Sequence, residues 1–213
     1  MNISNRDLKR RIIEISYKHK LSHLGSCLTA VDIIKEIYDV KKQDERFVLS
    51  SGHAGLALYV VLEKYLKLDA EKIFNHHGVH PDYCEECHID CSSGSLGNGL
   101  PIAVGMALAD RSKVCYTLIS DGECSEGSIW EALRIANEQK LNNLKIYLNF
   151  NHWGAYKEIP YYPINDEEFP YIDLKIKETN FDDFPFLIGQ SAHYITLSEE
   201  NFKLCQEILK EDS

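Results

Sequence analysis

The sequence contains no uninterrupted run of the roughly 20 apolar residues that a helix needs to cross a bilayer. Its opening ten residues, MNISNRDLKR, are polar and charged and lack the apolar core of a secretion signal. Internal repeats and low-complexity stretches are missing as well, which argues against fibrous and disordered chains. These absences predict a globular, cytoplasmic protein without membrane contact.

Positive charge is also scarce, because 23 Lys and Arg residues stand against 33 Asp and Glu residues, for a net charge of −10. Such a chain repels a phosphate backbone, so general nucleic-acid binding is not expected. The seven cysteines form an odd number. Since no secretion signal is seen and 213 residues can build a sufficient core, we interpret them as reduced thiols.

What the chain does contain is an ordinary globular composition with clear apolar periodicity. Leu8, Ile12 and Ile15 recur at helical spacing on one face of the first segment. The segment 100–109 is apolar all round, as a buried helix would be. The expected helices are 5–20, a segment capped by Thr29, 54–66, 100–109, 129–139 and a segment that starts at Ser198.

Two mainly apolar runs, 114–119 and Leu144–Phe150, are typical of buried parallel strands. The helix between them makes a strand–helix–strand crossover. Shorter runs at Arg46–Leu49 and 171–177 extend the pattern, and 154–170 is expected to be a loop. The alternation predicts an α/β fold, an open and mostly parallel sheet with helices on both faces.

Two polar side chains follow the central strands of this predicted sheet. Asp121 comes just after 114–119, and Asn151 directly follows the next strand. Open parallel sheets bind ligands beyond the carboxyl ends of their strands, so we expect the two to face each other across a crevice. Their hard oxygen donors suit Mg²⁺ or Ca²⁺, with phosphate oxygens completing the site. The alternative is an ordinary Asp-Gly turn and a strand-ending Asn.

A second glycine-rich stretch precedes the expected helix 100–109. Its sequence, Ser-Gly-Ser-Leu-Gly-Asn-Gly at 93–99, would let backbone N–H groups cradle a diphosphate. A flexible connection before a helix has the same composition, so this stretch alone decides nothing.

Five motifs in one order carry a specific resemblance. They are Ser-Gly-His at 51–53, Val-His-Pro at 79–81, Gly-Ser-Leu-Gly-Asn-Gly at 94–99, Asp-Gly-Glu-Cys-Ser-Glu-Gly at 121–127 with Trp-Glu-Ala at 130–132, and Asn151. This order resembles the transketolase family. More narrowly, it is similar to the amino-terminal, diphosphate-binding half of a split transketolase, whose two halves are separate chains.

The resemblance implies a thiamine diphosphate-binding fold of the diphosphate (PP) type, with thiamine diphosphate and a divalent cation. The implied metal ligands are Asp121 and Asn151 through their side chains and Trp153 through its carbonyl. The implied cofactor contacts are His53, Gly94, Ser95, Leu96, Asp121, Gly122 and Asn151. The implied catalytic residues are His23, His53, His80 and His193, which would face the sugar, and Glu126, a carboxylate at the subunit interface. Imidazoles of near-neutral pKa suit proton transfers at sugar hydroxyls.

The chain departs from the family pattern at several positions. Ser120 replaces the first glycine of Gly-Asp-Gly, and Asn149 replaces an acidic residue. His23 stands in Ser-His-Leu-Gly where the family has Gly-His-Pro-Gly, and 178–181 lacks the family's Lys-Gly-Lys-Gly turn. The stretch 155–170 is much shorter than in the family, so we expect one domain over 1–213 that is shortened there.

A cysteine-rich segment offers a competing interpretation. Cys84 and Cys87 have the CxxC spacing of a zinc knuckle, and His77, His88 or Cys91 would complete it. The usual second CxxC or histidine pair is missing. We therefore expect unliganded thiols here rather than zinc.

Our first hypothesis is the cofactor-binding subunit of a split transketolase that transfers a two-carbon ketol unit between phosphorylated or nucleotide-linked sugars. In the family a glutamate from a pyrimidine-binding domain activates the cofactor, and 213 residues leave no room for that domain. We therefore expect the chain to be inactive alone and to need a carboxy-terminal subunit, as a heterotetramer or a homodimer of halves. The alternatives are a non-catalytic relative that binds a partner, or a subunit of a thiamine enzyme acting on 2-oxo acids.

Overall fold

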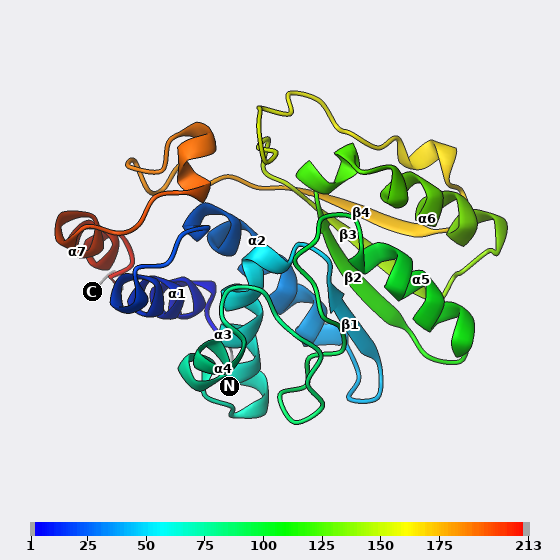
Figure 1. Cartoon of the computed structure of the whole chain (residues 1–213), viewed down its shortest axis with the longest axis horizontal. Coiled ribbons are helices and arrows are strands. Elements are labelled where there is room, and N and C mark those ends of the chain that lie inside the picture. The colour runs from blue at the N-terminus through cyan, green and yellow to red at the C-terminus, as the bar shows by residue number, and fades with distance from the viewer. Residues whose placement is uncertain (1–2, 211–213) are drawn as a thin grey trace.

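The computed structural model describes residues 3–210, so the ends of the predicted domain, 1–2 and 211–213, lie outside the described residues. Its centre is one sheet of four parallel strands in the order β1-β2-β3-β4 (Figure 1). The strands are β1 (Arg46–Leu49), β2 (Cys115–Ser120), β3 (Leu144–Phe150) and β4 (Asp173–Glu178). The predicted open parallel sheet is confirmed.

Helices cover both faces of the sheet (Figure 1). Side chains alternate along each strand, so Phe47 and Leu49 pack in one apolar core and Val48 in the other. Helices α1 to α4 and α7 build the first core, and α5 and α6 build the second. Their bounds are α1 (Asn5–His19), α2 (Leu24–Val40), α3 (Gly55–Leu66), α4 (Ala70–His77), α5 (Gly99–Ala109), α6 (Gly127–Glu138) and α7 (Glu199–Ile208).

The connection from β3 to β4 is the predicted loop and contains no α-helix, only the short 3₁₀ turn Asp166–Glu168. Ile164 of this loop is 2% exposed, and Phe169 and Ile172 pack beside it against the core of α5 and α6. Irregular chain thus buries apolar surface where a crossover helix ordinarily would.

The start of α2 corrects one prediction. The helix begins at Leu24, and His23 holds its capping position with a left-handed φ of 61°. The backbone N–H of His23 donates to the carbonyl of His193 (2.6 Å), which fixes this entry. Thr29 lies inside the helix, where its hydroxyl donates to the carbonyl of Gly25 (3.0 Å). The prediction that Thr29 caps the helix was therefore wrong.

Helix α4 was not predicted, because its eight residues carry only two buried positions, Ala70 and Ile73. The sequence nevertheless contained the N-cap residue of this helix, Asp69. In the structure the Asp69 carboxylate accepts the N–H groups of Glu71 and Lys72. The helix ends at His77 and leads directly into the cysteine-rich segment.

Helix α5 is not buried all round, contrary to its apolar sequence. Ala103 and Ala107 face the core, whereas Ile102 is 40% and Leu108 is 38% exposed. A Cβ added at Gly105 would meet only open space. The chain thus leaves an apolar stripe of α5 uncovered.

Among the helices within residues 3–210, none combines the length and apolar character needed to cross a bilayer.

Candidate functional site

The site forms where β2 and β3 end side by side. Ser120 of β2 is in register with Asn149 of β3, so the residues that follow each strand meet. The Asp121 carboxylate accepts the N–H of Gly122 through Oδ1 (2.9 Å) and the N–H of Asn151 through Oδ2 (3.0 Å). The structure therefore brings Asp121 and Asn151 together at adjacent strand ends.

The Asp121 carboxylate is a buried charge that lacks a cationic partner among the ion pairs of the described residues. The residue is only 1% exposed, and burial raises the pKa of its carboxyl to about 6. Two N–H groups use about half of the lone pairs that an ionised carboxylate offers. A cation would satisfy the rest and offset the cost of burying the charge.

Thr29 orients the two asparagines of the β3 end. Its hydroxyl oxygen accepts the side-chain amides of Asn149 (3.0 Å) and Asn151 (3.4 Å). The side-chain oxygen Oδ1 of Asn151 accepts the backbone N–H of Trp153 (3.0 Å), so this oxygen lies on the other side of the amide from Thr29. Asn149 stands where the family has an acidic residue, and here its oxygen accepts the hydroxyl of Thr179 (2.6 Å).

A cavity of about 190 Å³ opens beside these strand ends. Most residues predicted for the site line it, together with small and aromatic residues of the neighbouring loops. The predicted residues in its wall are His23, His53, His80, His193, Gly94, Leu96, Gly122, Asn151 and Trp153. Asp121 lies buried next to this wall.

Ser95 and Glu126 are not among the described residues that line the cavity. Both side chains are exposed. Glu126 lies against the glycine loop, since a Cβ on Gly97 would come within 2.7 Å of its Cβ. The position of Glu126 outside the cavity leaves it free for a contact with another chain.

Four histidines reach the cavity from four separate segments. His23 precedes α2, His53 follows β1, His80 follows α4, and His193 lies in the 3₁₀ turn Gly189–His193. The rings of His23 and His53 lie 5.4 Å apart between centroids. The fold thus assembles residues that are up to 170 positions apart in the sequence.

Burial keeps the rings of His23, His53 and His193 neutral. It lowers the pKa of His53 to about 3 and that of His193 to about 4, and it lowers the pKa of His23 as well. Neighbouring imidazoles add to the effect, because a second positive charge would be repelled. At neutral pH each ring therefore carries one N–H donor and one nitrogen acceptor.

Two of these rings have an unsatisfied buried atom. Nδ1 of His193 lies 2.6 Å from the hydroxyl of Ser26, but its Nε2 has no hydrogen-bond partner. Nδ1 of His23 also lacks one. Buried polar atoms are ordinarily satisfied, so two unpaired nitrogens in the wall of one cavity indicate a polar ligand.

The glycine-rich loop needs its glycines for steric reasons. Gly94 has a φ of 145°, and a Cβ there would lie 3.0 Å from the His80 ring. Gly97 has a φ of 81°, and a Cβ there would lie 2.5 Å from Oγ of Ser128. Both conformations are ones that side chains disfavour, so the loop is shaped for close backbone approach.

Glu123 holds this loop in place, and sequence reasoning assigned it no role. It is fully buried, its Oε1 accepts Ser50 Oγ (2.6 Å) and Gly97 N–H (3.0 Å), and its Oε2 accepts Ser120 N–H (3.0 Å). One carboxylate therefore connects the ends of β1 and β2 to the glycine loop. The sequence feature that could have revealed this role was an acidic residue in the turn after an apolar strand. A turn exposed to solvent shows the same feature, so the sequence alone did not distinguish the two.

The donor set fits a diphosphate held through a divalent cation. It combines a buried carboxylate without a cation, an oriented amide oxygen, glycines at the strand end and loop, and unpaired imidazole nitrogens. Fold and site together define an α/β cofactor-binding protein whose ligand lies at the carboxyl ends of parallel strands.

The comparisons identify the family. Residues 18–154 match the family described as "Transketolase, thiamine diphosphate binding domain". The chain belongs to the transketolase family, which confirms the resemblance found in its motifs.

Two curated relatives are named as transketolase subunits. The first is an apulose-4-phosphate transketolase subunit of Phocaeicola vulgatus, 34% identical over 163 residues that cover 67% of this chain and 58% of the relative. The second is the "6-deoxy-6-sulfo-D-fructose transketolase subunit SqwG" of a Clostridium species, 33% identical over 184 residues that cover 75% of this chain and 67% of the relative. The human transketolase is 36% identical over 159 residues, which cover 65% of this chain but only 25% of the human one.

A solved structure shares the fold. The transketolase of Campylobacter jejuni superposes with a TM-score of 0.79 at 22% identity, over 98% of this chain and 43% of that one. The chain thus spans 58% of its first curated relative and less than half of this structure. The similarity confirms the predicted thiamine diphosphate-binding fold.

Proposed function

We propose that this chain is the thiamine diphosphate- and Mg²⁺-binding subunit of a two-chain transketolase, which transfers a two-carbon ketol unit between sugars. The observation that carries the proposal is the pairing of Asp121 and Asn151 at adjacent strand ends, beside a cavity walled by four histidines. Membership of the family and the subunit names of two relatives support it.

In this proposal the side chains of Asp121 and Asn151 and the carbonyl of Trp153 hold Mg²⁺ or Ca²⁺. Gly122, Gly94, Ser95 and Leu96 receive the cofactor together with His53. When bound, thiamine diphosphate supplies the nucleophile and electron sink for breaking the carbon–carbon bond next to a ketose carbonyl.

The histidines supply hydrogen bonds and proton transfers at the sugar. His23 and His193 each have a buried nitrogen that lacks a partner, and a sugar hydroxyl would satisfy it. Because burial keeps His53 and His193 neutral, each offers one N–H donor and one acceptor nitrogen to the sugar. Their lowered pKa values make these two rings weak bases, so hydrogen bonding is the role that we assign to them. His80 lines the same cavity and completes the set. Sugars carry more hydroxyls than 2-oxo acids, so this wall favours a sugar, phosphorylated or nucleotide-linked.

The second chain would dock on the exposed apolar stripe of α5. Ile102 and Leu108 are uncovered there, and α6 exposes Trp130 (37%) next to the exposed Glu126 that precedes it. Apolar surface at this position favours a protein partner. In the proposed assembly this partner supplies the pyrimidine-side glutamate, and Glu126 lies at the interface. The 213 residues then act as one cofactor-binding unit.

The test is calorimetric titration of thiamine diphosphate with Mg²⁺ into this chain, alone and with a carboxy-terminal transketolase chain from the same organism. We expect binding that strengthens with the partner, and ketol transfer from ketose phosphates only when both are present. Full transfer by the purified chain alone would refute the need for a partner. Turnover of pyruvate instead of ketoses would point to a 2-oxo acid enzyme, and binding without any turnover to a non-catalytic module.

The docking surface has its own control. Ile102→Asp is expected to abolish complex formation in size-exclusion chromatography, whereas Ile188→Asp, at a residue 70% exposed in a different segment, leaves it intact. Equal behaviour of the two variants would contradict the assignment of the α5 stripe.

A further inference from the structure

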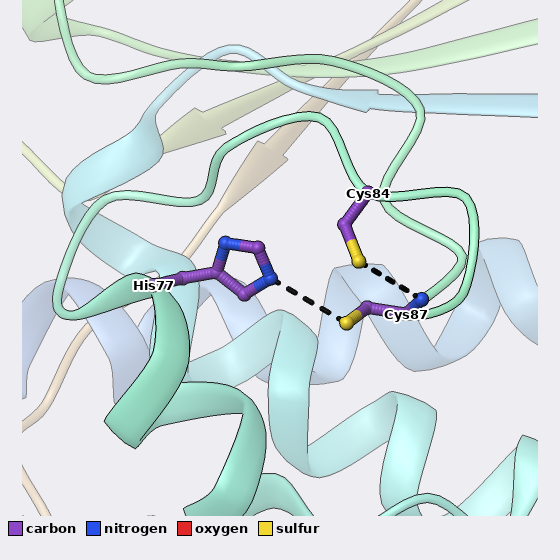
Figure 2. A group of neighbouring side chains, drawn as sticks. All are labelled: His77, Cys84 and Cys87. Atoms are coloured by element: carbon purple, nitrogen blue, oxygen red, sulfur yellow. Dashed lines mark hydrogen bonds between the residues drawn. The ribbon is translucent and has the colours of Figure 1, made fainter.

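A cluster of three metal-ligand side chains lies outside the cofactor site. His77, Cys84 and Cys87 each offer one ligand atom, and these atoms all lie within 4.8 Å of one another. Figure 2 shows the ring of His77, at the end of α4, directed at the Cys87 sulfur, with Cys84 alongside on the same loop. All three residues are half-buried.

The spacing matches a tetrahedral ion. Zinc binds sulfur at about 2.3 Å and imidazole nitrogen at about 2.0–2.1 Å, so tetrahedral angles separate the two ligand atoms by about 3.6 Å. Nε2 of His77 and Sγ of Cys87 lie 3.5 Å apart. This pair therefore already has the spacing of two zinc ligands, and Sγ of Cys84 lies within 4.8 Å of both atoms.

The local structure is built to present these ligands. The backbone N–H of Cys87 donates to Sγ of Cys84 (3.2 Å), which fixes the position of that sulfur. Cys84 and Ile89 exchange two backbone hydrogen bonds (3.0 and 2.9 Å) that close the hairpin around Cys87. Two thiols three positions apart are thereby held on one side of a tight loop.

Sequence reasoning predicted unliganded thiols, because no second pair of ligands follows the CxxC. The missing signal was helix α4, whose last residue supplies the third ligand. His88 and Cys91 were the other candidates to complete the site, and neither belongs to the cluster.

We propose that His77, Cys84 and Cys87 bind one Zn²⁺, with water in the fourth position. Two thiolates and an imidazole select zinc over Mg²⁺ or Ca²⁺, which prefer oxygen ligands. Partial exposure of all three residues leaves an entry path for the ion and room for the water. The site is separate from the proposed Mg²⁺ site, and its existence does not depend on the proposed function.

The bound zinc would hold in place the loop 81–93, whose flanking residues His80 and Gly94 line the cofactor cavity. The loop is joined at its base, where the N–H of Ser93 donates to the carbonyl of Pro81 (2.9 Å). His80 and Gly94 lie at its two ends, and both line the cavity. A zinc at the tip of α4 therefore ties the helix to the hairpin and holds both ends of the loop in place.

The decisive measurement uses the untagged full chain, purified in reducing buffer and incubated with ZnSO₄, then analysed for bound metal. We expect about one zinc per chain. Cys84→Ser, Cys87→Ser and His77→Ala are each expected to weaken zinc binding at least about tenfold in competition with a chelating dye. The matched controls Cys91→Ser and His88→Asn keep wild-type affinity, because they replace a neighbouring thiol and imidazole outside the cluster.

Spectroscopy of the wild-type chain keeps the test valid if a variant fails to fold. Co²⁺ bound in place of Zn²⁺ is expected to give the intense visible bands of a tetrahedral site and a thiolate charge-transfer band. A wild-type chain that binds no zinc, a Co²⁺ spectrum without thiolate bands, or variants that bind like the wild type would overturn the proposal. So would a Cys84–Cys87 disulfide in a chain that binds no zinc after reduction.

Discussion

Glu123→Gln offers a stringent test of how the site is held together. The substitution keeps the size of the side chain and replaces one carboxylate oxygen with an amide NH₂. In the structure Oε1 accepts the N–H of Gly97 and Oε2 accepts the N–H of Ser120. Either orientation of the amide therefore points an NH₂ group at a backbone N–H, so one buried donor loses its acceptor.

The expected cost follows from that geometry. An unsatisfied buried donor costs about 1–3 kcal/mol, and hydrogen bonds to a charged acceptor are stronger than neutral ones. Together they give a loss of about 2–4 kcal/mol in the free energy of unfolding. Burial raises the pKa of the Glu123 carboxyl, which means that the buried charge itself destabilises the wild-type chain. Removal of this charge in Glu123→Gln therefore offsets part of the expected loss.

Urea unfolding followed by circular dichroism measures this quantity. Glu131→Gln is the matched control, because Glu131 is exposed on α6, and we expect it to change stability by less than about 0.5 kcal/mol. Hydrogen exchange at the Gly97 and Ser120 amides gives a local readout, and one of the two should accelerate in Glu123→Gln but neither in Glu131→Gln. If both variants unfold like the wild type, Glu123 does not anchor the loop as described.

Three further perturbations test the site. Asp121→Asn removes a buried charge but turns an amide NH₂ toward the N–H of Gly122 or of Asn151, so the unliganded chain should lose less stability than Glu123→Gln does. Calorimetry should show binding of thiamine diphosphate with Mg²⁺ weakened at least about 100-fold. Burial lowers the pKa of His193 from 6.5 to about 4, so the unfolded chain binds the extra proton between these values and stability falls as pH drops through that window. The loss, on the order of 3 kcal/mol, should shrink in His193→Asn when urea midpoints are compared at pH 7.5 and 4.5. Gly97→Ala should cost about 1–3 kcal/mol in thermal unfolding, whereas Gly127→Ala, which meets open space, should not destabilise.

The sequence predicted the parts of the site that depend on local pattern. Mainly apolar runs mark β2 and β3, and the parallel arrangement then places Asp121 and Asn151 at one edge. The roles assigned to all the site residues stay predictions, and those of Ser95, Glu126 and the carbonyl of Trp153 rest on the family resemblance alone.

The sequence did not reveal contacts between distant segments. Thr29 looks like a helix cap, and only the fold shows it orienting Asn149 and Asn151 from inside α2. Glu123 looks like a turn residue until β1 and the glycine loop close over it. Helix α5 looks buried because apolar composition does not say whether the covering surface belongs to the same chain.

The helix-free passage from β3 to β4 has a consequence for divergence within the family. Its first residues meet the segment before α7, where the carbonyl of Ala155 accepts the side chains of Gln190 (2.6 Å) and Tyr194 (3.0 Å). Irregular chain, joined through a backbone acceptor, thus forms part of the cavity wall. Such chain tolerates substitution more readily than a packed strand does, so this part of the wall can change in sequence without disturbing the ends of β2 and β3.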